Sequence, residues 1–171
     1  IDVLVKGVQT LTYSVSDQAG NAAPSLIRSV NVQDMTAPVI ILSGDANATH
    51  EAMTPYIDPG ATAFDSFDGD LTANIVIGGD EVNASSPGTY QISYDATDEE
   101  GNLGRGIRSV TVLDTTPPAL SLQGSSTANL EAGTPFVEPG AIAIDSLDGD
   151  LSREVLVHGA PVNGNAVGSY T

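Results

Sequence analysis

The feature that most constrains the fold of this chain is an internal repeat. Residues 38–91 match residues 118–171 at a constant shift of 80, with Pro38 corresponding to Pro118. Residues 1–34 match the back half of the same unit, with one additional residue in a loop. Self-similarity at a fixed period indicates an array of similar domains. We therefore predict the C-terminal half of a repeat in residues 1–34, a complete repeat in 35–115, and the N-terminal part of a third in 116–171.

Short apolar runs separated by turn residues indicate that each repeat is built from β-strands. The chain contains 18 Gly and 10 Pro, and no run carries apolar residues at helical spacing. Regularly spaced short strands favour an all-β antiparallel sandwich, here with a period of about 80 residues. The complete repeat is predicted to have seven strands, at Val39–Ser43, Ala46–Ala52, Gly60–Asp65, Ala73–Ile77, Glu81–Ala84, Thr89–Thr97 and Leu103–Leu113.

The two longest predicted strands alternate as strands with one buried face do. In residues 89–97 the apolar and aromatic side chains share one parity and the polar side chains share the other. Two valines near the end of residues 103–113 also share a parity. The residues expected to face the core are Tyr90, Ile92, Tyr94, Ala96, Val110 and Val112.

Charge and composition exclude several functions. With 22 Asp and Glu against 5 Lys and Arg, the formal net charge is −17, which opposes binding to nucleic acid or to an anionic membrane surface. The sequence has no Cys, which excludes disulfides, thiolate-bound zinc and a cysteine nucleophile. No apolar run approaches the length of a membrane span. Because the chain begins inside a strand-like pattern at Ile1, we expect it to be part of a longer protein.

An acidic motif, Asp-x-x-Asp-Gly-Asp, occurs in the complete repeat and again in the third copy. Like charges this close raise one another's pKa unless a cation, hydrogen-bond donors or water offset them. Three carboxylates in one loop suit a hard cation with oxygen ligands, and calcium is the predicted ion. The alternative is a solvated turn in which Asp and Gly serve turn geometry alone. The predicted ligands are Asp65, Asp68, Asp70 and Asp114, with Asp145, Asp148 and Asp150 in the next copy.

The expected position of this loop suggests what the cation would do. If successive strands alternate in direction, the loop at Asp65 lies at the end of the domain where the last strand leaves, beside linker residue Asp114. The linker continues into Pro117-Pro118, and proline restricts its own backbone and that of the preceding residue. We therefore predict calcium-stiffened joints between neighbouring domains.

Other polar positions give weaker signals. Asp98 and Asp17 each precede a Gly-Asn turn and are expected to cap that turn rather than to bind a metal. Asp58 and Glu138, each followed by Pro-Gly, either reach across a joint or lie on the surface. No Ser/His/Asp pattern repeats, and no phosphate-binding loop is recognisable. A loop that recurs in each copy favours a structural role over catalysis, so we predict a non-enzymatic chain.

Three segments together carry a family resemblance. They are Pro-Gly-Ala-x-Ala-x-Asp-x-x-Asp-Gly-Asp-Leu from Pro59, Pro-Gly-Thr-Tyr from Pro87, and Val-x-Val-x-Asp-Thr-Thr-Pro-Pro from Val110. This pattern resembles the bacterial immunoglobulin-like repeats of large secreted and surface-anchored proteins, which also occur as accessory modules of extracellular enzymes and in some pesticidal crystal proteins. The resemblance covers essentially the whole chain and implies tandem immunoglobulin-like sandwiches.

The resemblance favours a segment of the stalk of an extracellular bacterial adhesin. Its partners would be neighbouring repeats of the same or an adjacent chain, on the cell surface or in a secreted protein, and the sequence names no adhesive ligand. One alternative is a filament subunit in which partial repeats of successive chains complete one another by strand addition. Another is an accessory module of a secreted polysaccharide-acting enzyme, which the 3 Phe, 5 Tyr and absence of Trp disfavour.

Overall fold

A computed structural model describes residues 1–159, 162, 163, 165 and 168 of the chain. These residues form β-strands and two short 3₁₀ helices, which confirms the predicted all-β class. Neither helix in this part of the chain has the length and apolar character needed to cross a membrane. Tyr170, the counterpart of Tyr90, lies outside the described residues.

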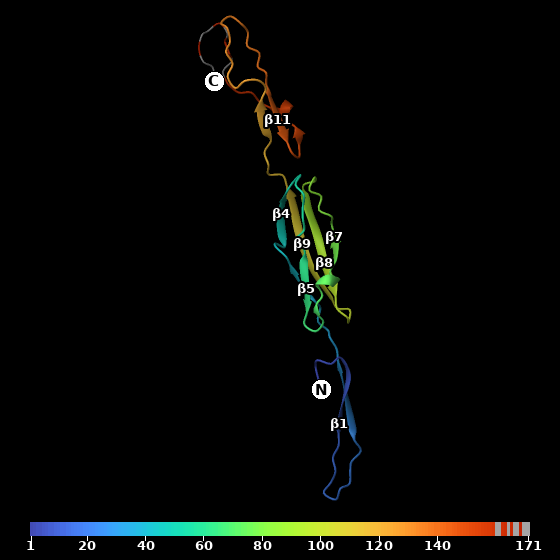
Figure 1. The fold of residues 1–171 in the computed structure, drawn as a ribbon. Coiled ribbons are helices and arrows are strands. Elements are labelled where there is room, and N and C mark those ends of the chain that lie inside the picture. The colour runs from blue at the N-terminus through green and yellow to red at the C-terminus, as the bar shows by residue number, and fades with distance from the viewer. Residues whose placement is uncertain (160–161, 164, 166–167, 169–171) are drawn as a thin grey trace. The chain divides into compact units, whose positions relative to one another are not determined.

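The middle repeat, described throughout residues 35–115, contains two sheets (Figure 1). One has three strands in the order β3-β5-β6, and the other has four in the order β4-β9-β8-β7. The first sheet comprises β3 (Val39–Leu42), β5 (Ala61–Asp65) and β6 (Gly69–Asp70). The second comprises β4 (Asn47–Glu51), β7 (Val76–Gly79), β8 (Gly88–Thr97) and β9 (Leu103–Leu113).

The expected alternation of strand direction is wrong at the first two strands. β3 and β4 both run in the same direction as β9. Beside β3, Pro38 lies against Gly104 and Ile40 against Gly106. Along β4, Ser109 N donates to Ala46 O (2.8 Å) and Ala52 N donates to Leu113 O (2.7 Å). Residue numbers therefore increase in the same direction on β4 and β9. The chain therefore changes sheet between β3 and β4 without reversing, through Gly44 at φ 80°, a left-handed conformation that favours glycine.

This change of sheet moves the acidic loop to the opposite end of the domain from the one predicted. β5 pairs antiparallel with β3, and Phe64 lies opposite Val39. The loop that follows β5 is consequently beside the start of β3. It lies where the chain enters the repeat, and the predicted neighbourhood of the loop at Asp65 with the exit residue Asp114 is incorrect.

Two further strand predictions differ from the structure. Residues 81–84 form no strand; Asn83 instead holds a turn, because its Oδ1 accepts from Ser85 N (3.0 Å) and its carbonyl accepts from Ser86 N (3.1 Å). The strand expected from Ala73 starts only at Val76, since the 3₁₀ helix η1 (Thr72–Asn74) precedes it. Short polar side chains that bond to nearby backbone groups compete with strand pairing in this way.

The predicted inward faces of β8 and β9 are confirmed. Ile92, Tyr94 and Ala96 are buried, and Tyr90 is partly buried. Val110 and Val112 are also fully buried. Between the sheets, the small side chains of Ala63 and Ala96 pack with Leu71, and Ile40 and Ile75 cover this cluster.

A buried arginine, missed by the sequence analysis, connects the two sheets. Arg108 is 1% exposed and its Nη1 donates to Asp58 Oδ2 at 2.7 Å. Its remaining nitrogens donate to the carbonyls of Ser43 (2.5 Å) and Asp45 (3.2 Å), which flank the change of sheet, and of Gly60 (3.1 Å), which precedes β5. The Tyr94 hydroxyl donates to Asp58 Oδ1 (2.6 Å), so Asp58 serves this network and does not reach across a joint.

The flanking copies repeat parts of this arrangement. β1 (Gly7–Tyr13) pairs antiparallel with β2 (Leu26–Val32), and Arg28 lies over the Tyr13 ring at 5.8 Å as Arg108 lies over Tyr94 at 5.6 Å. In the third copy, Glu138 takes the position of Asp58 and its Oε1 accepts from Gly140 N (3.0 Å). The described elements of that copy are β10 (Ala119–Leu122), β11 (Ala141–Asp145), β12 (Gly149–Asp150) and η2 (Ser152–Glu154).

Replacing the buried arginine tests this network. Arg108→Gln should lower the free energy of unfolding of the middle repeat by about 3 kcal/mol or more, because it leaves Asp58 and three carbonyls without their shared donor. Chemical denaturation measures the change. Arg105→Gln is the matched control: Arg105 lies on the same strand and pairs with Asp95 at 2.6 Å, but its side chain is 55% exposed. The control should cost less than about 1 kcal/mol, and equal costs for both variants would contradict this account.

Candidate metal centres

The acidic loop has the same backbone geometry in both copies. Asp65 Oδ1 accepts hydrogen bonds from Phe67 N (2.7 Å) and Asp68 N (3.1 Å). Asp145 Oδ1 likewise accepts from Leu147 N (2.7 Å) and Asp148 N (2.9 Å). Asp65 is only 1% exposed and Asp145 only 5%. The turn chemistry proposed as an alternative to metal binding is therefore present, and it uses one carboxylate oxygen of each of these two residues.

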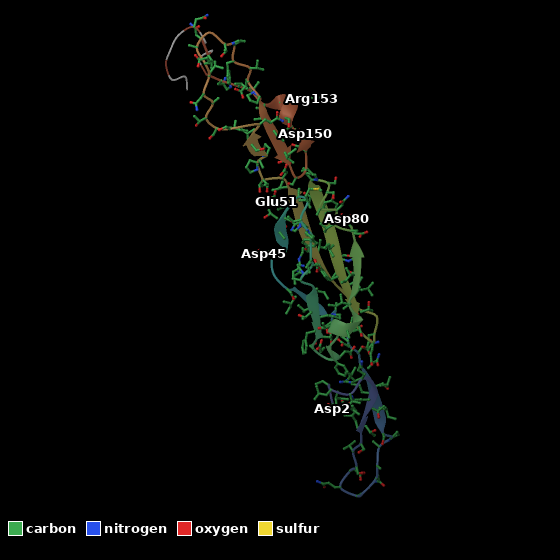
Figure 2. All side chains as sticks on the ribbon, turned by 45° about the horizontal axis from the view of Figure 1, so that its top comes forward. Asp2, Asp45, Glu51, Asp80, Asp150 and Arg153 are labelled. Carbon is green, nitrogen blue, oxygen red and sulfur yellow. The ribbon has the colours of Figure 1, made fainter. Side chains whose placement is uncertain are left out.

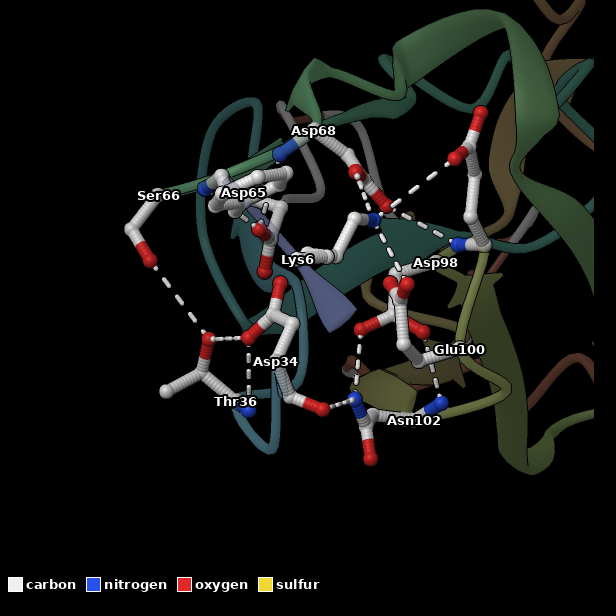
Figure 3. A network of polar contacts seen from close by, with 11 residues as sticks. Lys6, Asp34, Thr36, Asp65, Ser66, Asp68, Asp98, Glu100 and Asn102 are labelled. Carbon is white, nitrogen blue, oxygen red and sulfur yellow. Dashed lines mark hydrogen bonds and ion pairs between the residues drawn. The ribbon is translucent and has the colours of Figure 1, made fainter. Parts of the chain in front are cut away.

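Around the first loop, four acidic residues from three segments converge (Figure 3). Asp34 comes from the linker, Asp68 from the loop, and Asp98 and Glu100 from the β8–β9 hairpin, all within one compact unit of the chain. A carboxylate oxygen from each lies within 4.8 Å of the others. We call these four residues, together with Asp65 of the same loop, the first acidic group. Its spacing allows several of these oxygens to contact one cation.

Backbone and side-chain hydrogen bonds hold the three segments together. Asp68 Oδ2 accepts from Glu99 N (2.9 Å), which ties the loop to the hairpin. Asn102 Nδ2 donates to Asp98 Oδ2 (2.7 Å) and to the Asp34 carbonyl (3.5 Å), which ties the hairpin to the linker. Burial favours the protonated form of Asp98, but the hydrogen bonds from Asn102 and from the backbone of Gly101 and Glu100 together outweigh it and leave the pKa of this carboxyl below its usual value. Asp98 thus caps its turn as predicted and also belongs to the acidic group.

Two carboxylate oxygens at this place lack a hydrogen-bond donor. Asp34 Oδ2 and Asp65 Oδ2 are both buried and make no hydrogen bond within the described part of the chain. Figure 3 shows the two carboxylates directed toward one another. A buried charged oxygen without a donor is costly. These two atoms are therefore the strongest local indication that the residues suit a cation.

The second acidic group repeats this arrangement one copy further on. It consists of Asp114, Asp145 and Asp148, whose carboxylate oxygens also lie within 4.8 Å of one another, again within one compact unit. Asp114 occupies the same linker position as Asp34. The structure thus pairs each linker aspartate with the loop of the repeat that follows it, and it groups Asp114 with Asp145 and Asp148 in place of Asp65 and Asp68.

The last aspartate of each motif lies outside these two groups. Asp70 Oδ1 accepts from Thr72 N (2.9 Å), and Asp150 Oδ1 accepts from Ser152 N (2.9 Å) at the start of the following 3₁₀ helix (Figure 2). Hydrogen bonds from the hydroxyl and then the backbone of Thr72 lower the pKa of Asp70, and those of Ser152 do the same for Asp150. Each aspartate thus forms an Asx turn that leads into the 3₁₀ helix, whose N-cap residue is Leu71 or Leu151.

A second contact fixes the exit linker to the repeat before it. Glu51, at the end of β4 (Figure 2), accepts hydrogen bonds from the Thr115 hydroxyl (2.5 Å) and backbone N–H (3.1 Å). It also accepts from the hydroxyl (2.7 Å) and N–H (3.1 Å) of Thr116. These donors, the hydroxyls foremost, lower the pKa of Glu51 to about 2. Glu51 therefore holds Thr115 and Thr116, and the preceding residue of the same linker, Asp114, belongs to the second acidic group.

The fold also brings in a residue for which the sequence analysis gave no role. Lys6 Nζ lies 2.6 Å from Glu100 Oε1 and 3.5 Å from Asp68 Oδ1, within the first acidic group. It is the only lysine in the sequence, which is a signal that composition could have supplied. The inward position of Arg108 could have been predicted from the alternation along β9, because Arg108 shares its face of the strand with Val110 and Val112.

Comparison with known proteins establishes the family. The sequence model described as "Bacterial surface protein, Ig-like domain" matches residues 40–112 and again residues 120–171. These matches cover more than half of the chain. The chain therefore belongs to the family of bacterial surface protein immunoglobulin-like domains, which confirms the predicted resemblance.

Individual relatives are more distant. The chain is 28% identical to an uncharacterized 81.3 kDa protein of Acholeplasma phage L2 and 27% identical to the pesticidal crystal protein Cry22Aa of Bacillus thuringiensis. Each comparison covers 96% of this chain but 23% of the relative, so the chain spans less than a quarter of either protein. Among solved structures, the lipoprotein BT2262 of Bacteroides thetaiotaomicron is 26% identical, with a TM-score of 0.41 over 50% of this chain and 45% of that one.

The linker contact of Glu51 predicts a specific pH dependence. Because its pKa in the folded chain is about 2, below the ordinary value of 4.5, the contact is complete above pH 4.5 and is lost as the pH falls toward 2. NMR should show the amide protons of Thr115 and Thr116 titrating with a midpoint near 2. Glu51→Gln should abolish this titration, whereas Glu81→Gln, at an exposed position, should leave it unchanged. A midpoint above 4 in the unmodified chain would contradict the contact.

Proposed function

We propose that this chain is a non-enzymatic spacer segment of an extracellular repeat array, the stalk of a bacterial adhesin, whose domain joints are stiffened by calcium. Membership in the bacterial surface immunoglobulin-like family supports the spacer role and the extracellular location. The observation that carries the calcium proposal is the pairing of each linker aspartate with the acidic loop of the following repeat. An ion bound there would connect the linker to the domain.

The chemistry of the donors supports calcium over softer metals. All the side-chain ligands on offer are carboxylates, and hard cations such as calcium prefer oxygen. In the first acidic group, Asp34 Oδ2 and Asp65 Oδ2 are buried and have no donor among the described residues, so a cation would offset an existing cost. The net charge of −17 opposes close approach of the repeats, and bound cations would also reduce this repulsion.

The linkers themselves support a stiff joint. Glu51 holds Thr115 and Thr116 against the preceding repeat through four hydrogen bonds. Asp114, next to Thr115, would be held by the ion together with Asp145 and Asp148. A short linker that is held at both ends can adopt few backbone conformations. Such a joint suits a spacer that holds another part of a protein away from a cell.

Calorimetric titration with calcium chloride tests the proposal. The chain should bind one equivalent for each acidic group, with dissociation constants on the order of 10⁻⁴ to 10⁻³ M, as in extracellular calcium modules. Asp65→Asn should remove binding at the first group and Asp145→Asn at the second. Asparagine can still accept the two backbone hydrogen bonds of the loop turn, so the fold is retained.

The matched control is Asp45→Asn, which makes the same change of charge at an exposed aspartate outside both groups. It should bind calcium as the unmodified chain does. Small-angle X-ray scattering should also show a narrower range of particle dimensions in calcium than in chelator. Absence of binding heat, or equal binding by the Asp65→Asn and Asp145→Asn double variant, would refute the calcium proposal.

A further inference from the structure

The two acidic groups share a linker aspartate and the acidic loop motif but have different surroundings. At the first group, the ammonium of Lys6 lies 2.6 Å from Glu100 Oε1, 3.5 Å from Asp68 Oδ1 and 3.6 Å from Glu99 Oε2 (Figure 3). Lys6 belongs to the segment that leads into β1 of the first copy, whereas its three acidic partners belong to the middle repeat. This side chain therefore spans the first joint.

The environment of Lys6 is specific for an ammonium. Its Nζ lies 4.4 Å from the centre of the Phe67 ring, a distance suited to a cation–π contact. Its side chain is 25% exposed and that of Asp68 only 8%, so water screens this pair only partly. The hydrogen bond with Glu100 foremost, and the charge of Asp68, raise the pKa of Lys6 further above its usual value. The ammonium is therefore positively charged throughout the neutral pH range.

The sequence places no equivalent of this contact at the second joint. In the register that aligns Gln9 with Tyr90, Lys6 corresponds to Pro87, which has no charge. Phe67, which lies under the ammonium, corresponds to Leu147, which has no aromatic ring. Both halves of the cation–π pair are thus absent from the second copy. These two independent differences both indicate that the second joint lacks the Lys6 contact.

We infer that Lys6 is a covalently attached cation for the first acidic group, so that the two joints respond differently to calcium. The first joint is held by Lys6 in the absence of a divalent ion and binds that ion more weakly. At the second joint no lysine joins Asp114, Asp145 and Asp148, so the ion alone would bridge these carboxylates, while Glu51 holds the linker to the preceding repeat. This inference rests on the proposed function for its calcium component, whereas the role of Lys6 in the metal-free joint stands on the contacts themselves.

Competition between the two cations follows from electrostatics. A calcium ion bound by Asp34, Asp65 and Asp68 would lie within a few ångströms of the ammonium and would repel it. Calcium must therefore displace Lys6 from Asp68 and Glu100 or bind beside it. Because a tethered group has a high effective concentration at its partner, the displacement is costly. Removing the Lys6 charge should then strengthen calcium binding at the first group on the order of tenfold, within the usual range of coupling between two sites.

Calorimetry in single-site backgrounds isolates this effect. In the Asp145→Asn background, Lys6→Gln should increase the calcium affinity of the first group about tenfold. In the Asp65→Asn background, it should leave the affinity of the second group unchanged. Arg28→Gln is the matched control, because it removes the same charge from the same copy at a residue that contacts Tyr13. An unchanged affinity of the first group, or an equal gain with Arg28→Gln, would overturn the competition.

A metal-free measurement tests the tether separately. Because the sequence has no Cys, spin labels can be attached at cysteines introduced at Thr10 and Glu81, both exposed. In chelator, Lys6→Gln should broaden the distance distribution between the labels, and Arg28→Gln should not. An unchanged width would overturn the tether. If no variant binds calcium while Lys6→Gln still broadens the distribution, the calcium proposal fails and the tether stands.

Discussion

Electrostatic repulsion among carboxylates at the entrance of a repeat is the constraint on which this structure depends. The fold brings Asp34, Asp65, Asp68 and Asp98 together although the chain carries a net charge of −17. Turn hydrogen bonds satisfy some of the carboxylate oxygens, but Asp34 Oδ2 and Asp65 Oδ2 have no donor among the described residues. We propose that a positive charge completes such a site: the ammonium of Lys6 lies at the first joint, and a divalent ion would supply the charge at both.

The position of that charge follows from one backbone feature. Gly44 lets the chain pass from one sheet to the other without reversing, which sets β5 antiparallel to β3 and returns the acidic loop to the entry linker. Arg108 then fixes this change of sheet from within, through the carbonyls of Ser43 and Asp45.

Sequence reasoning recovered the features that depend on local pattern. The repeat, the all-β class, the inward faces of β8 and β9 and the loop turn at Asp65 were all predictable, because they follow from periodicity and side-chain type. The direction of β4 was not, since a strand that changes sheet has the same alternation as one that reverses. That single ambiguity placed Asp114 with the wrong loop. It also hid the meeting of Asp34 with Asp98, which depends on pairing between distant segments.

The most direct test of the central claim is to locate a bound metal in crystals of the chain. Manganese is a suitable probe because it shares calcium's preference for carboxylate oxygen and gives an anomalous X-ray signal. The account predicts a strong anomalous peak among Asp114, Asp145 and Asp148, and a weaker one beside Asp34 and Asp65 that strengthens in Lys6→Gln. Peaks at Asp70 or Asp150, or crystals with manganese bound only away from the linker aspartates, would contradict it.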